Sequence, residues 1–284
     1  MTIKIDGANL ARQIRARVAD EAARHFPDPA TAPGLATILV GDDPASAVYV
    51  AGKRRAVVQA GMRDMHRSLP ATATQARIAE VIDELAEDPE VAGILLQLPL
   101  PAGLDARSLI ERIPPGKDVD GLTTASAGLL ARDQHGLRPC TPSGIIELLD
   151  SQSITIEGSQ ACVVGRSDLV GRPMGQMLVN RDATVTVAHK GTRDLISATR
   201  QADILVVATG VRHLIGREHV KPGAAVIDVG IHRTPHGLTG DVRAEELDGF
   251  AKFITPVPGG VGPMTIAMLM VNTIEAARWA AQGA

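Results

Sequence analysis

The chain has 284 residues, which exceeds one average domain and is enough for two of ordinary size. Hydrophobic residues make up 45% and charged residues 21%, a globular composition that excludes a disordered protein. The net charge of −3 argues against nucleic acid or an anionic membrane as a partner, because both attract a clustered positive face.

The two cysteines, Cys140 and Cys162, have no CxxC spacing and fit a reducing compartment. The N-terminal residues lack the basic-then-apolar profile of a signal peptide, and no stretch has the length and apolarity of a membrane span. We therefore expect a soluble, cytoplasmic protein without a membrane partner. Aromatic residues are only 2% of the chain, so the lone tyrosine, Tyr49, needs an explanation.

The first half alternates short strands with longer helices. Strands are predicted over residues 34–41 and 91–97, and helices over 45–61 and 74–87, the second with Thr74 as a plausible N-cap. Repetition of strand, helix and strand implies parallel sheets with right-handed crossovers.

Glycine, proline and threonine become frequent around residues 135–143, so we place the domain junction there. Thr141 is a plausible N-cap and Pro142 a plausible first helical residue. Strands are expected beyond it at 161–164, 184–187, 204–208 and 225–228, with helices at 172–180 and 193–201. This alternation is typical of a dinucleotide-binding half. A last helix, from Gly262 to about Gln282, could return to pack on the first domain.

A glycine-rich segment, Gly165 to Gly175, follows a strand and opens a helix. Glycine lets a backbone approach a pyrophosphate, and a helix N-terminus offers unpaired N–H groups. The spacing differs from GxGxxG, so a simple strand-to-helix turn is the alternative. His189 and Lys190 end the second strand, where a basic residue accommodates a 2′-phosphate. NADP is thus favoured, with NAD as the alternative, although Lys190 could equally be a solvated surface charge.

Tyr49 and Lys53 lie four residues apart, and on a helix they share one face with Ser46 one turn earlier. A lysine desolvated beside an aromatic ring can lose its proton near pH 7–8, against an ordinary pKa of about 10.4, and so serve as an acid or base. The alternative is an ordinary surface lysine beside a half-buried tyrosine.

Two further fragments carry polar groups. Gln97 follows an apolar strand and precedes Leu98-Pro99-Leu-Pro101, at the kind of strand end where open α/β sheets bind ligands. Asp118 and Asp120 follow Pro115-Gly-Lys117. Each fragment could be only a turn, with the aspartates as ordinary loop caps.

Taken together, the fragments resemble one family. The first half, with Pro44-Ala-Ser46, Tyr49, Lys53, Gln97-Leu-Pro-Leu-Pro101, Lys117-Asp-Val-Asp120-Gly-Leu122 and Pro139-Cys-Thr-Pro142, is similar to methylenetetrahydrofolate dehydrogenase/cyclohydrolases. So is the second half, with Gly165-Arg-Ser167, Val170-Gly-Arg-Pro173, Asp228-Val-Gly-Ile231, Gly240-Asp-Val242 and Pro256-Val-Pro-Gly-Gly-Val-Gly-Pro-Met-Thr265. The matches keep their order over most of the chain.

The resemblance implies two α/β domains flanking a cleft, the second a Rossmann-like, parallel-sheet domain. Residues 1–140, joined by the C-terminal helix at about 266–284, would bind folate, and residues 141–265 would bind NAD(P). It also implies a homodimer built through the cofactor domains.

The resemblance assigns roles as well. Lys53 would be the catalytic lysine, Gln97 would orient it, Tyr49 would pack against the substrate, and Asp120 would bind the pterin's amino edge. The expected substrate set is Tyr49, Ser46, Gln97, Leu98, Pro99, Asp120, Pro258, Gly259 and Thr265. The expected cofactor set is Thr141, Gly165, Arg166, Ser167, Val170, Gly171, Pro173, His189, Lys190, Thr209, Gly210, Gly230, Ile231, Gly260 and Gly262.

The implied chemistry is oxidation of 5,10-methylenetetrahydrofolate with NADP reduction, followed by hydrolysis of the methenyl product to 10-formyltetrahydrofolate. The alternatives are a dehydrogenase with weak or absent cyclohydrolase activity, or a catalytically silent folate- or nucleotide-binding protein. Family members often carry His-Ser-x-Thr where this chain has His189-Lys190-Gly191-Thr192, which leaves the handling of the 2′-phosphate open. His232 and His236 are separated by Pro235, so no metal is expected.

Overall fold

The computed structural model describes residues 1–282, and the chain divides into two compact units. Unit 1 contains Met1–Ala11 and Thr141–Thr265, and unit 2 contains Arg12–Cys140 and the chain from Ile266 onward. Residues 283 and 284, which the predicted 266–284 segment includes, lie outside the described residues. Residues 1–11, predicted to belong to the first domain (1–140), belong instead to unit 1, which otherwise corresponds to the predicted second domain (141–265).

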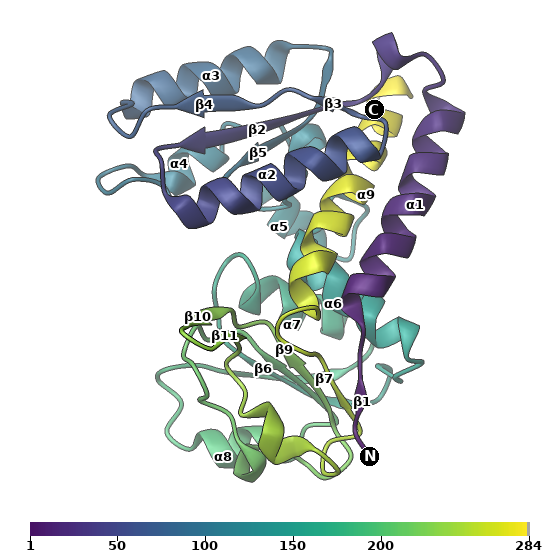
Figure 1. The fold of residues 1–284 in the computed structure, drawn as a ribbon, viewed down its shortest axis with the longest axis vertical. Coiled ribbons are helices and arrows are strands. Elements are labelled where there is room, and N and C mark those ends of the chain that lie inside the picture. The colour runs from purple at the N-terminus through teal and green to yellow at the C-terminus, as the bar shows by residue number, and fades with distance from the viewer. Residues whose placement is uncertain (283–284) are drawn as a thin grey trace. The chain divides into compact units, whose positions relative to one another are not determined.

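Unit 1 is built on a six-stranded sheet whose neighbouring strands all run parallel, in the order β1-β12-β9-β8-β6-β7. Figure 1 labels β1, β6, β7 and β9 of this sheet. Its strands are β1 (Ile3–Lys4), β6 (Gln160–Val164), β7 (Thr184–Ala188), β8 (Ile204–Val207), β9 (Ala225–Asp228) and β12 (Phe253–Ile254). An antiparallel hairpin, β10 (His232–Thr234) and β11 (Gly237–Thr239), is separate. The four predicted strands are confirmed. Pairing of β1 with β12 explains why the N-terminal residues join this unit.

The helices of unit 1 are α7 (Gly171–Val179) and α8 (Leu195–Thr199), with most of α6 (Cys140–Ser151) and the short turns η3 (Arg217–His219) and η4 (Ala244–Leu247). After β6 the chain forms β7 on one side and then returns to β8 on the other. This reversal beside β6 is the topological switch at which doubly wound sheets bind ligands. The predicted α/β, Rossmann-like fold is thereby confirmed.

Unit 2 has a smaller parallel sheet in which β2 is paired on one side by β3 and β4 and on the other by β5. The strands are β2 (Gly34–Val40), β3 (Arg63–Asp64), β4 (Arg67–Leu69) and β5 (Val91–Leu96). The helices are α1 (Gly7–His25, from Arg12), α2 (Pro44–Gln59), α3 (Gln75–Glu87), α4 (Ala106–Ile110), α5 (Thr124–Ala131) and α9 (Val261–Ala281, from Ile266), with turns η1 (Pro29–Thr31) and η2 (Pro115–Lys117).

Alternation along β2 sends Ala36, Ile38 and Val40 into one core with the apolar stripe of α3 (Ile78, Val81, Ile82 and Leu85). Thr74 is confirmed as the N-cap of α3, because its hydroxyl accepts from Arg77 N–H at 3.2 Å. In the same unit α1 lies beside α9 (Figure 1). Arg278 of α9 contacts Glu21 of α1 at 2.9 Å.

One helix start was predicted wrongly. Helix α6 begins at Cys140, so Thr141 is not its N-cap. The Thr141 hydroxyl is engaged elsewhere, with the Thr265 hydroxyl at 2.9 Å. Competition from this tertiary hydrogen bond is the physical reason that the local capping signal was misleading.

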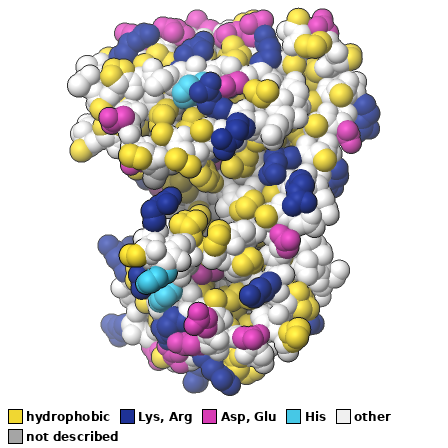
Figure 2. Space-filling view, viewed as in Figure 1, with side chains coloured by type: hydrophobic (Ala, Val, Ile, Leu, Met, Phe, Trp, Pro, Cys, Tyr) yellow, Lys and Arg dark blue, Asp and Glu magenta, His cyan; other side chains and the backbone are white. Residues whose placement is uncertain are grey.

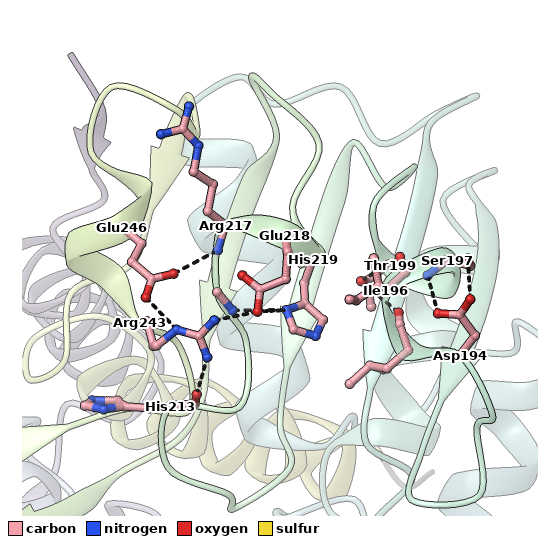
Figure 3. Close-up of polar contacts among 12 residues, drawn as sticks. Asp194, Ile196, Ser197, Thr199, His213, Arg217, Glu218, His219, Arg243 and Glu246 are labelled. Atoms are coloured by element: carbon pink, nitrogen blue, oxygen red, sulfur yellow. Dashed lines mark hydrogen bonds and ion pairs between the residues drawn. The ribbon is translucent and has the colours of Figure 1, made fainter.

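A polar network in unit 1 connects η3 with η4 (Figure 3). The Arg243 guanidinium donates to Glu218 at 2.5 Å, to Glu246 at 2.7 Å and to the carbonyl of His213 at 2.9 Å. None of these residues belongs to the predicted site sets, and the network fastens two loops of the fold.

Acidic and basic side chains are interspersed on the face of the molecule drawn in Figure 2. Within residues 1–282, no helix has both the length and the apolarity needed to cross a membrane.

Candidate active site and dinucleotide-binding elements

Helix α2 presents the first group of predicted residues on one face. It begins after Asp43, whose carboxylate accepts from Ser46 N–H at 2.7 Å. Ser46 is buried, Tyr49 is half-buried, and Lys53 is only 5% exposed. The Lys53 Nζ lies 4.9 Å from the centroid of the Tyr49 ring, a cation–π distance. The alternative of a surface lysine is therefore excluded.

Gln97 holds the lysine from the end of β5. Its backbone N–H donates to Ile38 O at 2.9 Å, so the residue is fastened to the end of the sheet. Its side-chain Oε1 accepts from Lys53 Nζ at 3.0 Å, while Nε2 donates to Leu98 O at 2.6 Å. With both ends of the amide engaged, Gln97 fixes the direction in which the amine points. The next residues differ in accessibility, with Leu98 half-buried and Pro99 exposed.

Asp120 lies in a loop that a second aspartate organises. Asp118 is 1% exposed, and its carboxylate accepts from Leu122 N–H, Thr123 N–H and the Ser126 hydroxyl at 3.1, 2.8 and 2.7 Å. Gly121 follows with φ +64°, a conformation that glycine adopts without strain. Asp118, and not Asp120, therefore accepts the hydrogen bonds that shape the loop.

Burial dominates the electrostatics of this cluster. It lowers the pKa of Lys53, an effect that the negative charge of Asp120 opposes. Burial also raises the pKa of Asp120, opposed by the charge of Lys53 and by a hydrogen bond with Cys140. An amine with a lowered pKa has a larger neutral fraction near neutral pH and can accept a proton there.

Sequence reasoning missed Cys140 as part of this site. Its thiol donates to Val119 O at 3.2 Å, and it lies close enough to Asp120 to influence the pKa of that carboxyl group. Burial raises the pKa of this thiol well above its ordinary value, so it stays protonated. The available signal was its place inside Pro139-Cys-Thr-Pro142, one of the fragments that carry the family resemblance.

In unit 1 the glycine turn after β6 is built by close backbone approach. Gly165 has φ +134°, and a Cβ there would lie 2.2 Å from Ala208 O. A Cβ on Gly171 would lie 2.2 Å from Gly165 O. The Ser167 hydroxyl accepts from Val170 N–H and Gly171 N–H at 3.2 and 3.4 Å, where α7 begins. A turn this tight brings a helix N-terminus to the carboxyl end of β6, which suits a pyrophosphate.

The side chains around this turn differ in exposure. Arg166 and Ser167 are exposed, whereas Pro173 is buried inside α7. Arg166 also contributes, with Arg172 and His189, to a shallow hollow between α7 and β7. The exposed cationic and hydroxyl groups are thus available to a ligand, while the buried residues maintain the turn.

His189 shapes the turn that follows β7. Its Nδ1 accepts from Gly191 N–H at 3.0 Å, and its backbone N–H donates to the Thr192 hydroxyl at 2.9 Å. The donor in the first contact is a backbone N–H, so Nδ1 carries no proton. His189 therefore holds the turn, and Lys190 is exposed at its tip.

The ends of β8 and β9 are joined by buried aspartates. The carboxylate of Asp241, fully buried, accepts from Thr209 N–H, the Thr209 hydroxyl and Gly210 N–H at 2.7, 2.8 and 2.9 Å. Asp228 accepts from Gly230 N–H and Asp241 N–H at 3.0 and 2.9 Å, and burial raises its pKa to about 6. These bonds fix the loops that carry Thr209, Gly210 and Gly230.

The segment before α9 completes this side of unit 1. A Cβ on Gly262 would lie 3.5 Å from Ile231 Cδ1, and Ile231 is 56% exposed. Gly259 O accepts from Ala8 N–H at 2.9 Å, and Gly260 leaves no room for a side chain beside Pro256 O. An exposed isoleucine beside a glycine offers an apolar surface to a flat ring.

The predicted residues thus fall into two groups. Unit 2 contains Ser46, Tyr49, Lys53, Gln97, Leu98, Pro99 and Asp120. Unit 1 contains Pro258, Gly259 and Thr265 together with all fifteen residues of the predicted cofactor set. Among residues 1–282, no cluster of three or more His, Cys, Asp or Glu side chains could hold a metal ion.

A parallel sheet with a glycine turn at its switch point, and a second unit with a buried lysine, define a two-unit α/β protein of the dinucleotide-binding enzyme class. Residues 5–120 match the tetrahydrofolate dehydrogenase/cyclohydrolase catalytic domain, and residues 139–281 match the NAD(P)-binding domain of the same proteins. The chain belongs to the tetrahydrofolate dehydrogenase/cyclohydrolase family.

Individual relatives agree over nearly the whole chain. The bifunctional protein FolD 2 of Frankia casuarinae is 62% identical, covering 96% of this chain and 95% of the relative. The crystal structure of the bifunctional FolD enzyme of Campylobacter jejuni has a TM-score of 0.95 at 41% identity, covering 98% and 99% of the two chains. That of Trypanosoma brucei, complexed with NADP and an inhibitor, has a TM-score of 0.93 at 36% identity, covering 99% of each.

Proposed function

We propose that this protein oxidises 5,10-methylenetetrahydrofolate to 5,10-methenyltetrahydrofolate with reduction of NADP, and then hydrolyses the product to 10-formyltetrahydrofolate. The observation that carries the proposal is the buried amine of Lys53, which lies 3.0 Å from Gln97 Oε1 and beside the Tyr49 ring. The bifunctional relatives and both family matches support the same pair of activities.

In the hydrolytic step, water adds to the methenyl carbon between N5 and N10. Neutral Lys53 accepts the proton that the water oxygen loses as its bond to carbon forms. The resulting ammonium gives a proton to N5 as the carbon–N5 bond breaks, and the hydroxyl of the adduct loses its proton to solvent, which leaves the formyl group on N10. Gln97 holds the amine in position, and Tyr49 offers a ring face against which the substrate packs.

Asp120 has a different role in the proposal. Its carboxylate accepts hydrogen bonds from the amino edge of the pterin, and its charge limits how far the pKa of Lys53 falls. Ser46, Leu98 and Pro99 line the same substrate site in unit 2. The assignment of Pro258, Gly259 and Thr265 to the substrate remains a prediction, because these residues belong to unit 1.

The tight backbone turn of unit 1 suits a dinucleotide. A Cβ at Gly165 or Gly171 would strike a carbonyl oxygen, so these positions keep the turn that exposes the start of α7. When bound, NADP supplies the acceptor for the hydride that leaves the methylene carbon. Arg166, Ser167 and Lys190 hold its phosphates, while Thr209, Gly210, Gly230 and Ile231 contact the rest. Thr141, Val170, Pro173, Gly260 and Gly262 maintain this surface.

The protein is further proposed to act as a homodimer in the cytoplasm. Strand β7 is one of the two edge strands of the sheet, and its Val187 is 44% exposed. An unpaired edge carrying exposed apolar side chains can pair with a second copy. Cys140 and Cys162 are both free and buried, which suits a reducing compartment.

The test is to follow both reactions separately with the purified protein. NADP reduction should accompany formation of the methenyl chromophore from methylenetetrahydrofolate, and the chromophore of added methenyltetrahydrofolate should then decay faster than in buffer. NADP reduction without accelerated decay of the methenyl chromophore would identify a dehydrogenase that lacks cyclohydrolase activity. Tight binding of both ligands without either reaction would instead identify a silent binding protein.

A further inference from the structure

Asn272, which no prediction assigned to the site, lies on α9 more than a hundred residues from the catalytic loops. It is 7% exposed, and its side-chain Nδ2 donates to Val119 O at 2.8 Å and to Arg138 O at 2.8 Å. The same nitrogen lies 3.6 Å from Cys140 Sγ. One amide thus connects two separate loops of unit 2.

The two carbonyls that it binds stand directly before site residues. Val119 precedes Asp120, and Arg138 precedes Pro139 and Cys140. The two loops touch, because a Cβ on Gly121 would lie 2.6 Å from the carbonyl carbon of Arg138. Two carbonyl oxygens directed toward one place repel each other and need a donor between them. Pro139 has no N–H to offer, and Asn272 Nδ2 supplies a donor that both carbonyls share.

The Cys140 thiol is a second contact between the two loops. The Cys140 thiol donates to Val119 O at 3.2 Å, so Val119 O receives hydrogen bonds from both the thiol and Asn272. The thiol also lies close to Asp120, whose charge in turn acts on Lys53. The contacts therefore run from Asn272 through Cys140 and the Val119 carbonyl to Asp120.

We propose that Asn272 is a positioning residue for the folate site: it fixes the loops carrying Asp120 and Cys140, and through them the placement of Asp120 toward the pterin and toward Lys53. The proposal rests on the proposed function of this site. Asn272 touches neither the substrate nor the cofactor in this scheme.

The chain offers a matched control in the next residue of α9. Thr273 is fully buried, and its hydroxyl donates to Leu269 O at 2.7 Å within the same helix. Replacing Thr273 by Val removes a buried hydrogen bond without touching either loop. A purely structural role for Asn272 predicts the same behaviour from changes at both positions.

The experiment compares Asn272→Leu, Asn272→Ser and Thr273→Val with the wild type. Asn272→Leu should raise KM for methylenetetrahydrofolate by about tenfold, because two buried carbonyls lose their common donor. Asn272→Ser, which keeps a hydroxyl donor at this position, is the second variant should the leucine protein fold poorly. KM for NADP should stay within about twofold in each, since that ligand belongs to unit 1. Thr273→Val should lower Tm and leave both KM values unchanged.

A double-mutant cycle with Asp120→Asn gives the sharper readout. If Asn272 acts through Asp120, its replacement should change the folate KM far less when Asp120 has already been changed. Equal effects in the two backgrounds, or a folate KM that changes no more than in Thr273→Val, would overturn the proposal. Failure of the proposed function is separate, because the wild type itself would then show neither reaction.

Discussion

The lysine cluster of unit 2 depends on side chains, whereas the glycine turn of unit 1 depends on the backbone. Around Lys53 the chemistry lies in side chains, which are buried, hydrogen-bonded to one another and shifted in pKa. Around Gly165 it lies in the backbone, and the charged side chains, such as Arg166 and Lys190, are exposed. Desolvation tunes a proton-transfer group, whereas an anionic ligand needs close N–H donors and accessible charge.

This comparison predicts different sensitivities. In unit 2, a substitution that keeps the backbone intact should still abolish the chemistry. In unit 1, the backbone itself is the binding element, so adding one methyl group to a glycine should be more harmful than removing an exposed charge. The following variants test that contrast.

The largest effect is expected from Lys53→Met. Removing the proton-transfer group should lower the rate of methenyltetrahydrofolate hydrolysis by about 10² to 10⁴-fold, with the fold intact. The rate is measured from decay of the methenyl absorbance, and the fold from circular dichroism. Lys221→Met is the control, because that lysine pairs with Asp203 in unit 1. Hydrolysis at the wild-type rate in Lys53→Met would remove this residue from the mechanism.

A glycine pair tests the backbone of unit 1. Gly165→Ala should cost about 2 kcal/mol or more of folding free energy and abolish NADP binding, since its Cβ would meet Ala208 O at 2.2 Å. Gly210 also has a positive φ, of +68°, but a Cβ there meets nothing within 4 Å. Gly210→Ala should therefore cost only about 1 kcal/mol. Urea unfolding and NADP titration measure both, and equal losses would contradict the close-approach explanation.

Lys190→Ala should have a smaller and more selective effect. If the exposed amine meets the 2′-phosphate, KM for NADP should rise by about tenfold, as expected for one lost charged contact, while KM for NAD changes little. Initial rates with each cofactor give the comparison, and Arg193→Ala serves as a nearby basic control. Parallel changes in the two KM values would show that Lys190 does not read the phosphate.

The smallest effect is a shift in pH dependence. The neutral form of Lys53 increases as pH rises through its pKa, so the hydrolytic kcat should rise with pH. The charge of Asp120 raises that pKa, and Asp120→Asn removes the charge. The acidic limb of the kcat profile should consequently move to lower pH in the variant. An acidic limb that stays in place, or moves to higher pH, would show that the charge of Asp120 does not raise the pKa of Lys53.

Much of the fold could be read from local patterns. The strands at 161–164 and 225–228 followed from short β-branched runs and the Thr74 cap from its capping signal, which depend on neighbours in the sequence. The pairing of β1 with β12 could not be read this way, because two-residue strands carry no pattern and are defined by distant partners. The helix at 193–201 was expected to be longer than α8, which spans Leu195–Thr199 after its Asp194 cap.

The site residues likewise divide into those predictable from local spacing and those defined by tertiary contacts. The i, i+4 spacing of Tyr49 and Lys53 was enough to predict their contact, since helix geometry alone brings them together. Cys140 and Asn272 were missed because their roles arise from loops that meet only in the folded unit. The cap at Thr141 failed for the same reason, as a tertiary hydrogen bond with Thr265 took its hydroxyl.

The central claim, that Lys53 is a desolvated amine whose pKa lies below the ordinary value, can be measured directly. The chain has six lysines, so ¹³C-labelled lysine gives a resolvable NMR titration in which the signal absent from Lys53→Met identifies this residue. The account predicts a midpoint below the ordinary lysine value of about 10.4, and a still lower one in Asp120→Asn. A midpoint at the ordinary value, unchanged in that variant, would contradict it.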